Sequence, residues 1–245
     1  MKKLAWIITF MLTISVNAIA TTWSPSKHKC PICSKTNTYY EIMSYGGYIY
    51  QWPTKFQYVF WPLIDQESVY CCPDCHFATY MWDFDSIPNE KKDTIELFLK
   101  TVKLDKKYKD YRSIPMTTRL LIAENVYNIL GRDDEFWCKF YRVLGYHFDV
   151  ENKKSQAQSS RFKALELAKT MVNDTARIDQ KKENLFIVAA MYNYTSQKDS
   201  ALKYLDYTIN LKYANKNMKE ENATGLDEYL TDLIVQYRDL LLKGE

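Results

Sequence analysis

The sequence predicts an α+β protein that is mostly helical, with a small zinc-ribbon-like β module followed by a tetratricopeptide-like array of antiparallel helix hairpins. Two observations lead to this prediction. The motif Cys-Pro-x-Cys occurs twice, at residues 30–33 and 72–75, and the segment between the two copies is rich in aromatic residues. Farther along, apolar residues recur at the three- and four-residue spacing of amphipathic helices. We therefore divide the chain into a signal peptide (1–20), a zinc-binding aromatic-rich module (21–86) and a helical domain (87–245).

The N-terminus has the three parts of an export signal. Lys2 and Lys3 form a positive start, residues 4–16 are apolar, and residues 18–20 read Ala-Ile-Ala, which fits a small-x-small cleavage site. An uncleaved anchor is the alternative, but the apolar run is short for a bilayer span. We expect cleavage near Thr21 and an exported protein, periplasmic or secreted, with no stable membrane insertion after cleavage.

Charge argues against a nucleic-acid partner. The formal net charge is +3, and removal of Lys2 and Lys3 with the signal peptide leaves +1. Proteins that bind nucleic acids need a basic footprint, which a near-neutral exported chain lacks. The sequence also contains no HExxH motif, no Gly-rich phosphate loop and no motif that pairs a nucleophile with a base. We therefore expect a protein that is not an enzyme.

Each Cys-Pro-x-Cys motif, here called a cysteine hook, places two thiolates three positions apart on a tight turn. One hook grips one face of a metal ion, and a second hook completes the tetrahedron of a closed structural zinc site. We therefore predict one zinc site, with these ligands: Cys30, Cys33, Cys72 and Cys75. The segment between the hooks exceeds the common ribbon spacing, so it must carry structure of its own.

The remaining candidates for the site leave alternatives open. Six cysteines outside the cytoplasm could form three disulfides, although a bridge between cysteines three apart is strained or catalytic rather than structural. Cys71 is either a spare beside the second hook or replaces Cys72 as a ligand. His28 and His76 are two further candidates for the metal shell. Cys138 lies in a helical stretch, where we expect a small buried hydrophobe.

The aromatic segment from Tyr39 to Trp61 predicts two or three short antiparallel strands. Gly46 and Gly47 indicate a turn, and apolar residues alternate on both sides of it, with an interruption at Pro53. We interpret the rings as the core of a module too small for a large aliphatic core, and the alternative is an aromatic platform for a glycan or a peptide. Residues 21–38 are interpreted as a lead-in with the first hook, and the acidic-aromatic residues 82–85 as a solvated loop.

Helices are expected from residue 89 onward. Their predicted positions are a start near Asn89 with a basic tail over 103–112, then 115–130, a helix after Asp133, 161–172, 182–194, 198–213 and a final helix. Pro115 and Gly131 suit a helix start and stop, and the acidic residues after Arg132 suit a positive helix end. The basic tail is a solvated face by default, and docking of an acidic partner is the alternative.

Smaller features complete the helical part. Residues 151–160 are predicted to be a polar link, and His147 is expected to be a satisfied core residue. Ser196 with Asp199, and Thr224 with Asp227, resemble capping boxes at the starts of the last two helices. The pair over 185–213 looks like one tetratricopeptide-type repeat, because small residues at Ala189 and Ala201 let the helices approach closely.

With these motifs the chain resembles a bacterial family known as a domain of unknown function, in which two Cys-Pro-x-Cys hooks precede helices of tetratricopeptide character. The matching residues are Cys30, Pro31 and Cys33, then Cys72, Pro73, Cys75 and Ala78, then the hairpin over 185–213. The family tends to have Gly after each hook, where this chain has Ser34 and His76. The resemblance implies this architecture and a zinc site, and it implies no chemistry.

The function we expect is that of an exported, non-catalytic, zinc-stabilised interaction or scaffold protein whose helical hairpins bind a protein or peptide partner. One alternative is a thiol–disulfide oxidoreductase of the cell envelope that uses the Cys-Pro-x-Cys pairs. A second alternative is a metal-dependent hydrolase, in which His28 or His76 replaces a cysteine and leaves a coordination position open for water.

Overall fold

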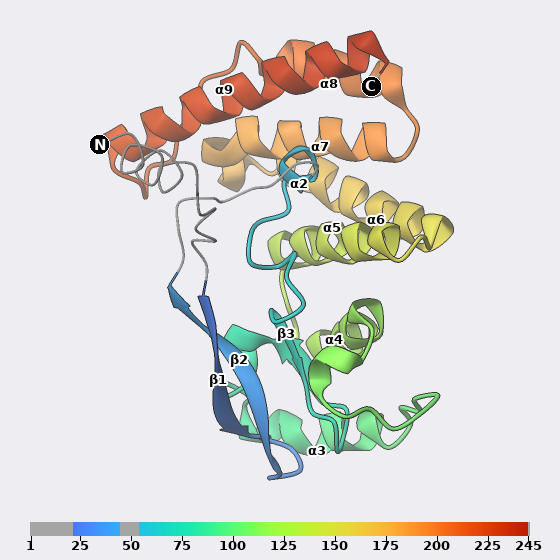
Figure 1. The fold of residues 1–245 in the computed structure, drawn as a ribbon. Helices are drawn as coiled ribbons and strands as arrows, with labels where there is room; N and C mark the ends of the chain where they lie inside the picture. The colour runs from blue at the N-terminus through green and yellow to red at the C-terminus, as the bar shows by residue number, and fades with distance from the viewer. Residues whose placement is uncertain (1–21, 45–53, 245) are drawn as a thin grey trace, which may run out of the picture.

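The computed structural model describes residues 22–44 and 54–244, and it is mostly helical with two small antiparallel hairpins near the start of the chain (Figure 1). The predicted α+β, mostly helical class is therefore confirmed. Both the predicted signal peptide and the predicted turn at Gly46 and Gly47 lie outside the described residues. Within those residues, no helix combines the length and apolar character that a membrane span requires.

The first hairpin consists of β1 (Thr22–Lys29) and β2 (Thr36–Ser44), which pair antiparallel with His28 opposite Asn37. The prediction of a lead-in over 21–38 is wrong, because residues 22–29 form a strand. Its side chains are exposed or only partly buried, so the sequence TWSPSKHK shows no apolar alternation that could have revealed it.

The second hairpin consists of β3 (Val69–Cys71) and β4 (Ala78–Tyr80), whose residues are all buried. Between the two hairpins, Thr54–Gln57 form a short helix, α2, so the predicted strand over 56–60 is wrong. The rings here pack against distant helices rather than on a sheet: Phe56 stacks on Tyr237 with ring centroids 4.6 Å apart. The alternating rings therefore reflect contacts with distant helices and not the two faces of a strand.

Seven longer helices follow at α3 (Asn89–Leu99), α4 (Met116–Leu130), α5 (Asp134–Val150), α6 (Lys154–Asn173), α7 (Lys181–Tyr194), α8 (Lys198–Thr208) and α9 (Glu220–Lys243), among the described residues. Short 3-10 turns lie at Met81–Asp83, Tyr111–Ser113 and Thr175–Gln180. The predicted ends of α4 are confirmed, since Pro115 precedes it and Gly131 follows it with φ 74°. Asp133 caps α5 by accepting a hydrogen bond from the Phe136 N–H.

Three helix boundaries differ from the prediction. α6 begins at Lys154, so the polar link over 151–160 shrinks to a tight turn in which Asn152 has φ 59°. α9 begins at Glu220 and runs through Thr224 and Asp227, which therefore do not cap it. Ser196 likewise lies in the turn before α8 with φ 65°, and Gln197 is the residue at the N-cap.

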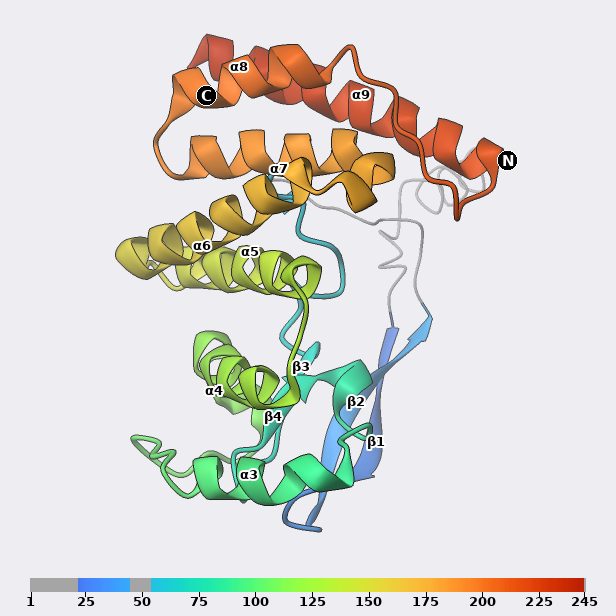
Figure 2. The ribbon, with the colours of Figure 1, turned by 180° about the vertical axis from the view of Figure 1, so that it is seen from behind.

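Two apolar core clusters organise the described residues. The first joins the two hairpins to α3, α4 and part of α5, and it contains residues on both sides of the predicted module boundary, such as Phe84 and Ile95. The second joins α6, α7, α8 and α9, together with Phe56 and Tyr58. Figures 1 and 2 show α5 to α9 stacked in succession, with α8 and α9 farthest from β1 and β2. The hairpins α5–α6 and α7–α8 are each packed pairs.

Candidate metal centre

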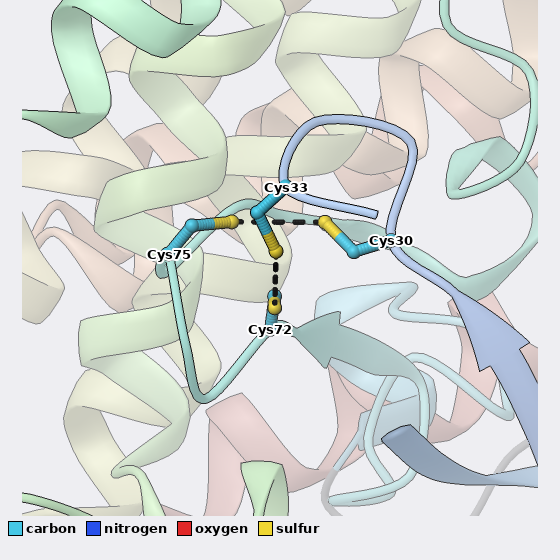
Figure 3. A group of neighbouring side chains, drawn as sticks. All are labelled: Cys30, Cys33, Cys72 and Cys75. Atoms are coloured by element: carbon cyan, nitrogen blue, oxygen red, sulfur yellow. Dashed lines mark hydrogen bonds between the residues drawn. The ribbon is translucent and has the colours of Figure 1, made fainter. Parts of the chain in front are cut away.

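The two cysteine hooks meet in space and bring four sulfurs together (Figure 3). The Sγ atoms of Cys30, Cys33, Cys72 and Cys75 all lie within 4.8 Å of one another. The Cys30–Cys75 and Cys33–Cys72 Sγ separations are both 3.6 Å. Four thiolates at the usual zinc–sulfur distance would lie about 3.8 Å apart at the corners of a tetrahedron. The cluster therefore has the donor type and the size that a tetrahedral zinc ion requires.

Both hooks have the same backbone hydrogen bonds. In the first, the Ser34 N–H donates to the Cys30 carbonyl at 3.0 Å and the Cys30 N–H donates to the Lys35 carbonyl at 2.8 Å. In the second, the His76 N–H donates to the Cys72 carbonyl at 2.8 Å and the Cys72 N–H donates to the Phe77 carbonyl at 2.8 Å. Each hook is thus the turn of one hairpin, and the pairing of the strands holds its cysteines in place.

Ser34 and His76 occupy the positions where a glycine was expected, and both adopt the left-handed backbone conformation, with φ 61° and 65°. This conformation costs a residue with a side chain more than it costs glycine. The turn geometry is nevertheless the same in both hooks. Both hooks therefore adopt the left-handed turn without glycine, at a higher conformational cost.

The thiols affect one another's proton affinity. Hydrogen bonds from the Cys72 and Cys75 thiols lower the pKa of Cys30 to about 4. The same contacts with Cys30 raise the pKa of Cys72 and of Cys75. The close contact of these thiols therefore favours the thiolate form at Cys30 and the protonated form at Cys72 and Cys75. A divalent cation would bind all four sulfurs as thiolates and displace their protons.

The other sequence candidates lie outside the cluster. Cys71 is buried with its thiol directed at the His76 carbonyl oxygen, 3.6 Å away, and burial raises the pKa of Cys71 to about 12. His28 lies between two carboxylates, with Nδ1 3.0 Å from Asp85 and Nε2 2.7 Å from Glu41. Among residues 22–44 and 54–244, the one group of cysteines, histidines and carboxylates close enough to share a metal ion contains neither histidine.

Asn37, which the sequence did not single out, lies beside the cluster. Its side-chain NH2 is 3.7 Å from the Cys72 sulfur and donates to the Asp74 carboxylate at 2.9 Å. An amide that faces a ligand sulfur stabilises the thiolate and orients it. Asn37 is the second residue of β2, just after the first hook, and it contacts Cys72 and Asp74 of the second hook, so only the meeting of the two hooks gives it these partners.

The comparison with protein families gives a match over most of the chain. The family described as "Uncharacterized protein conserved in bacteria (DUF2225)" matches residues 24–226, a range that contains both hooks and nearly all of the helices. This chain belongs to the DUF2225 family. The bacterial family of unknown function suggested by the hooks and the helices is therefore confirmed. Comparisons with curated proteins and with solved structures found no match.

In this DUF2225 protein the described aromatic residues around the hooks form a core. Tyr39 and Tyr70 are buried and stacked, with ring centroids 4.5 Å apart, and Phe84 and Tyr111 pack on Tyr39 at 4.9 and 5.0 Å. These rings favour the interpretation of an aromatic core over that of a ligand platform. Phe84 is one of the residues predicted to form a solvated loop over 82–85. That prediction is wrong for Phe84, which is buried, whereas Trp82 and Asp85 are exposed.

The carboxylates of this former loop also have partners. Asp83 accepts hydrogen bonds from the Tyr127 hydroxyl at 2.7 Å and from Arg132 at 3.0 Å. Cys138 matches its expectation, since it is buried with its thiol 3.5 Å from the Ala164 carbonyl oxygen. His147 is also a satisfied core residue, because its Nε2 lies 2.9 Å from the Leu63 carbonyl oxygen.

Proposed function

We propose that this DUF2225 protein is an exported, non-catalytic scaffold in which one zinc ion holds the two hairpins together and the helical hairpins bind a protein or peptide partner. The observation that carries the zinc half of the proposal is the convergence of four cysteine sulfurs within 4.8 Å. Four thiolates would fill a tetrahedral shell and leave no coordination position for a reacting water. Such a closed shell supports a structural role for the metal.

A structural role also follows from what the hooks connect. One hook ends β1 and the other follows β3, so a shared ion would cross-link two hairpins that are otherwise joined through residues 34–71. Each hairpin has only two strands, which is marginal for stability in water. A metal bridge would offset the entropy of closing this long connection.

The test of the zinc site is the metal content and the free-thiol count of the full chain, purified without chelator. We expect one zinc per chain, and we expect Cys72→Ser to lose it. Cys138→Ser is the matched control, because Cys138 is also buried but contacts Ala164 on α6 instead of the cluster. A metal-free protein with Cys30–Cys33 or Cys72–Cys75 disulfides would overturn the zinc site and favour the thiol–disulfide enzyme.

The scaffold half of the proposal rests on the outer helices. Tyr207 on α8 and Leu242 on α9 are large apolar side chains that are more than half exposed, at 53% and 55%. A photo-reactive residue at position 207 in the exported protein should form one dominant protein adduct, and the same residue at position 103, in the basic segment before α4, should not. Equal labelling from both positions, or none, would contradict partner binding at the helical hairpins.

N-terminal sequencing of the exported protein tests cleavage near Thr21.

A further inference from the structure

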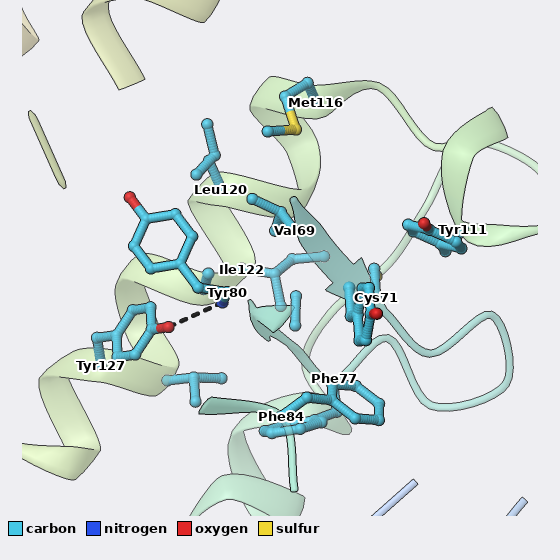
Figure 4. Packing of buried hydrophobic residues seen from close by; sticks show 14 of the residues in the cluster. Val69, Cys71, Phe77, Tyr80, Phe84, Tyr111, Met116, Leu120, Ile122 and Tyr127 are labelled. Atoms are coloured by element: carbon cyan, nitrogen blue, oxygen red, sulfur yellow. Dashed lines mark hydrogen bonds between the residues drawn. The ribbon is translucent and has the colours of Figure 1, made fainter. Parts of the chain in front are cut away.

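A cavity of about 490 Å³ lies between the first turn of α4 and the last turn of α5, and none of the clustered cysteines lines it. Its volume is in the range of small-molecule sites. Part of the wall is apolar, with Ile64, Met116, Tyr146 and Val150. The polar part includes Arg112, Arg119, His147 and Glu151. Figure 4 shows Met116 at the first turn of α4 and Tyr111 in the segment that leads to it.

Arg119 is the unusual member of this wall, because it is a fully buried cation that pairs with no carboxylate of residues 22–44 and 54–244. Its Nε donates to the Ile114 carbonyl at 3.0 Å, and its Nη1 donates to the carbonyls of Gln66 at 2.6 Å and Val69 at 2.7 Å. Its Nη2 is buried and has no hydrogen-bond partner in that part of the chain. Burial lowers the pKa of Arg119 to about 10, which leaves the group charged at neutral pH.

The other ionisable groups of the wall are already balanced. Arg112 pairs with Glu67 at 3.2 Å, and the Glu151 carboxylate is 2.6 Å from the Lys153 ammonium. Burial lowers the pKa of His147 to about 4, so its ring is neutral near pH 7. The carboxylates that act on Arg119 from a distance, Glu67 and Glu151, are thus each paired with another cation. Among the described residues, the positive charge of Arg119 therefore has no carboxylate of its own at this cavity.

A buried charge is costly unless an opposite charge and hydrogen bonds satisfy it, and here a donor remains free. We propose that the cavity binds a small organic acid with one carboxylate, which supplies the missing counter-charge to Arg119 with Arg112 beside it. The apolar tail of the acid packs against Ile64, Tyr146 and Val150. The single unbalanced charge and the apolar wall favour a monocarboxylate over a phosphate, which has more charge and no apolar part.

The binding test uses the full-length exported protein and three probes: 3-phenylpropionate, its neutral amide 3-phenylpropanamide, and inorganic phosphate. Isothermal titration should give saturable binding of the carboxylate at one site. The amide should bind at least about tenfold more weakly, since it cannot supply the charge-assisted hydrogen bonds. In NMR spectra the Arg119 side-chain N–H signals should move with the carboxylate and not with the amide. Equal affinity for acid and amide would overturn the proposal, and tighter binding of phosphate would do so as well.

Two variants separate ligand binding from folding. Val150→Trp should block the cavity and lower the affinity for 3-phenylpropionate at least about tenfold, because Val150 lines the cavity and is 60% exposed, so the larger side chain does not disturb the core. Leu97→Trp on α3 is the matched control, since Leu97 is 64% exposed and does not line this cavity. Unchanged affinity in Val150→Trp, or no saturable binding of the acid by about 10 mM, would overturn the site.

Discussion

The backbone N–H of Tyr80 donates a hydrogen bond to the hydroxyl oxygen of Tyr127 at 2.8 Å, which joins the strand after the second hook to the last turn of α4 (Figure 4). The Tyr127 hydroxyl donates in turn to the Asp83 carboxylate at 2.7 Å. Both tyrosine side chains are buried. One phenol therefore satisfies a strand-end N–H and a carboxylate, and it couples the hairpin that carries Cys72 and Cys75 to the helical part.

Tyr127→Phe should lower the free energy of unfolding by about 1–3 kcal/mol, because the substitution keeps the ring but leaves the Tyr80 N–H without an acceptor in a buried site. Denaturant unfolding of the full chain measures the change. Tyr207→Phe is the control, since Tyr207 is 53% exposed on α8 and should change the free energy by less than about 0.5 kcal/mol. A loss no larger than that of the control would show that water replaces the Tyr127 hydroxyl.

Gly145→Ala should also destabilise the fold. A Cβ atom at Gly145 would lie 3.0 Å from Arg161 Cγ and 3.3 Å from the Ala157 carbonyl oxygen, where α6 crosses α5. Crowding of this kind typically costs about 1–3 kcal/mol. Gly225→Ala on α9 is the matched control, because nothing lies within 4 Å of its Cβ position and alanine favours a helix. Thermal unfolding should rank the proteins as Gly225→Ala, wild type and Gly145→Ala, in order of falling stability. If Gly145→Ala unfolds at the wild-type temperature, α5 and α6 are not closely packed there.

The parts of the fold that were predictable are those whose signal is local in sequence. A cysteine hook is four residues long, and its tight turn holds two thiols close together. Two such hooks predicted the cluster because four thiols held in two close pairs suit the tetrahedral shell of one metal ion. The boundaries of α4 were predictable for the same reason, since Pro115 and Gly131 act on the backbone of their immediate neighbours.

The parts that were missed depend on contacts across the chain. Phe56 is buried against Tyr237, which is far away in the sequence. The apolar residues around Phe56 therefore did not indicate that it lies in the helix α2. Asn37 follows the first hook in sequence but contacts Cys72 of the second hook, a contact that forms only when the two hooks meet in space. Arg119 is fully buried although arginine is usually exposed, and the carbonyls that hold it come from Gln66, Val69 and Ile114. No sequence pattern signals such a site.

The stability of the protein should depend on pH through His147. Burial lowers its pKa from 6.5 to about 4, so between these values the unfolded chain binds a proton that the folded chain excludes. The contribution of His147 to the free energy of unfolding is therefore fully present above about pH 6.5. It falls by up to about 1.4 kcal/mol for each pH unit between about pH 6.5 and pH 4. His147→Gln keeps a donor for the Leu63 carbonyl but does not titrate.

The measurement is the free energy of unfolding of wild type and His147→Gln from pH 4 to 8, in buffers free of organic acids. The difference between the two proteins should grow as the pH falls below about 6.5, which removes the contribution of carboxylates that both share. Parallel curves would mean that folding does not lower the pKa of His147.

Metal removal should loosen one core cluster and spare the other. The hooks lie in the first cluster with residues of β2, β3 and β4, and β1 pairs with β2, whereas α7, α8 and α9 pack in the second cluster. A zinc chelator added to the full chain should therefore speed amide hydrogen exchange in residues 22–44 and 69–80 by at least about tenfold, and leave residues 181–194 unchanged. Cys138→Ser should respond as wild type does, and Cys72→Ser should show fast exchange in the hairpins before any chelator is added. Exchange that rises equally in α7 would mean that the ion supports the whole chain, and exchange that rises nowhere would exclude a structural metal.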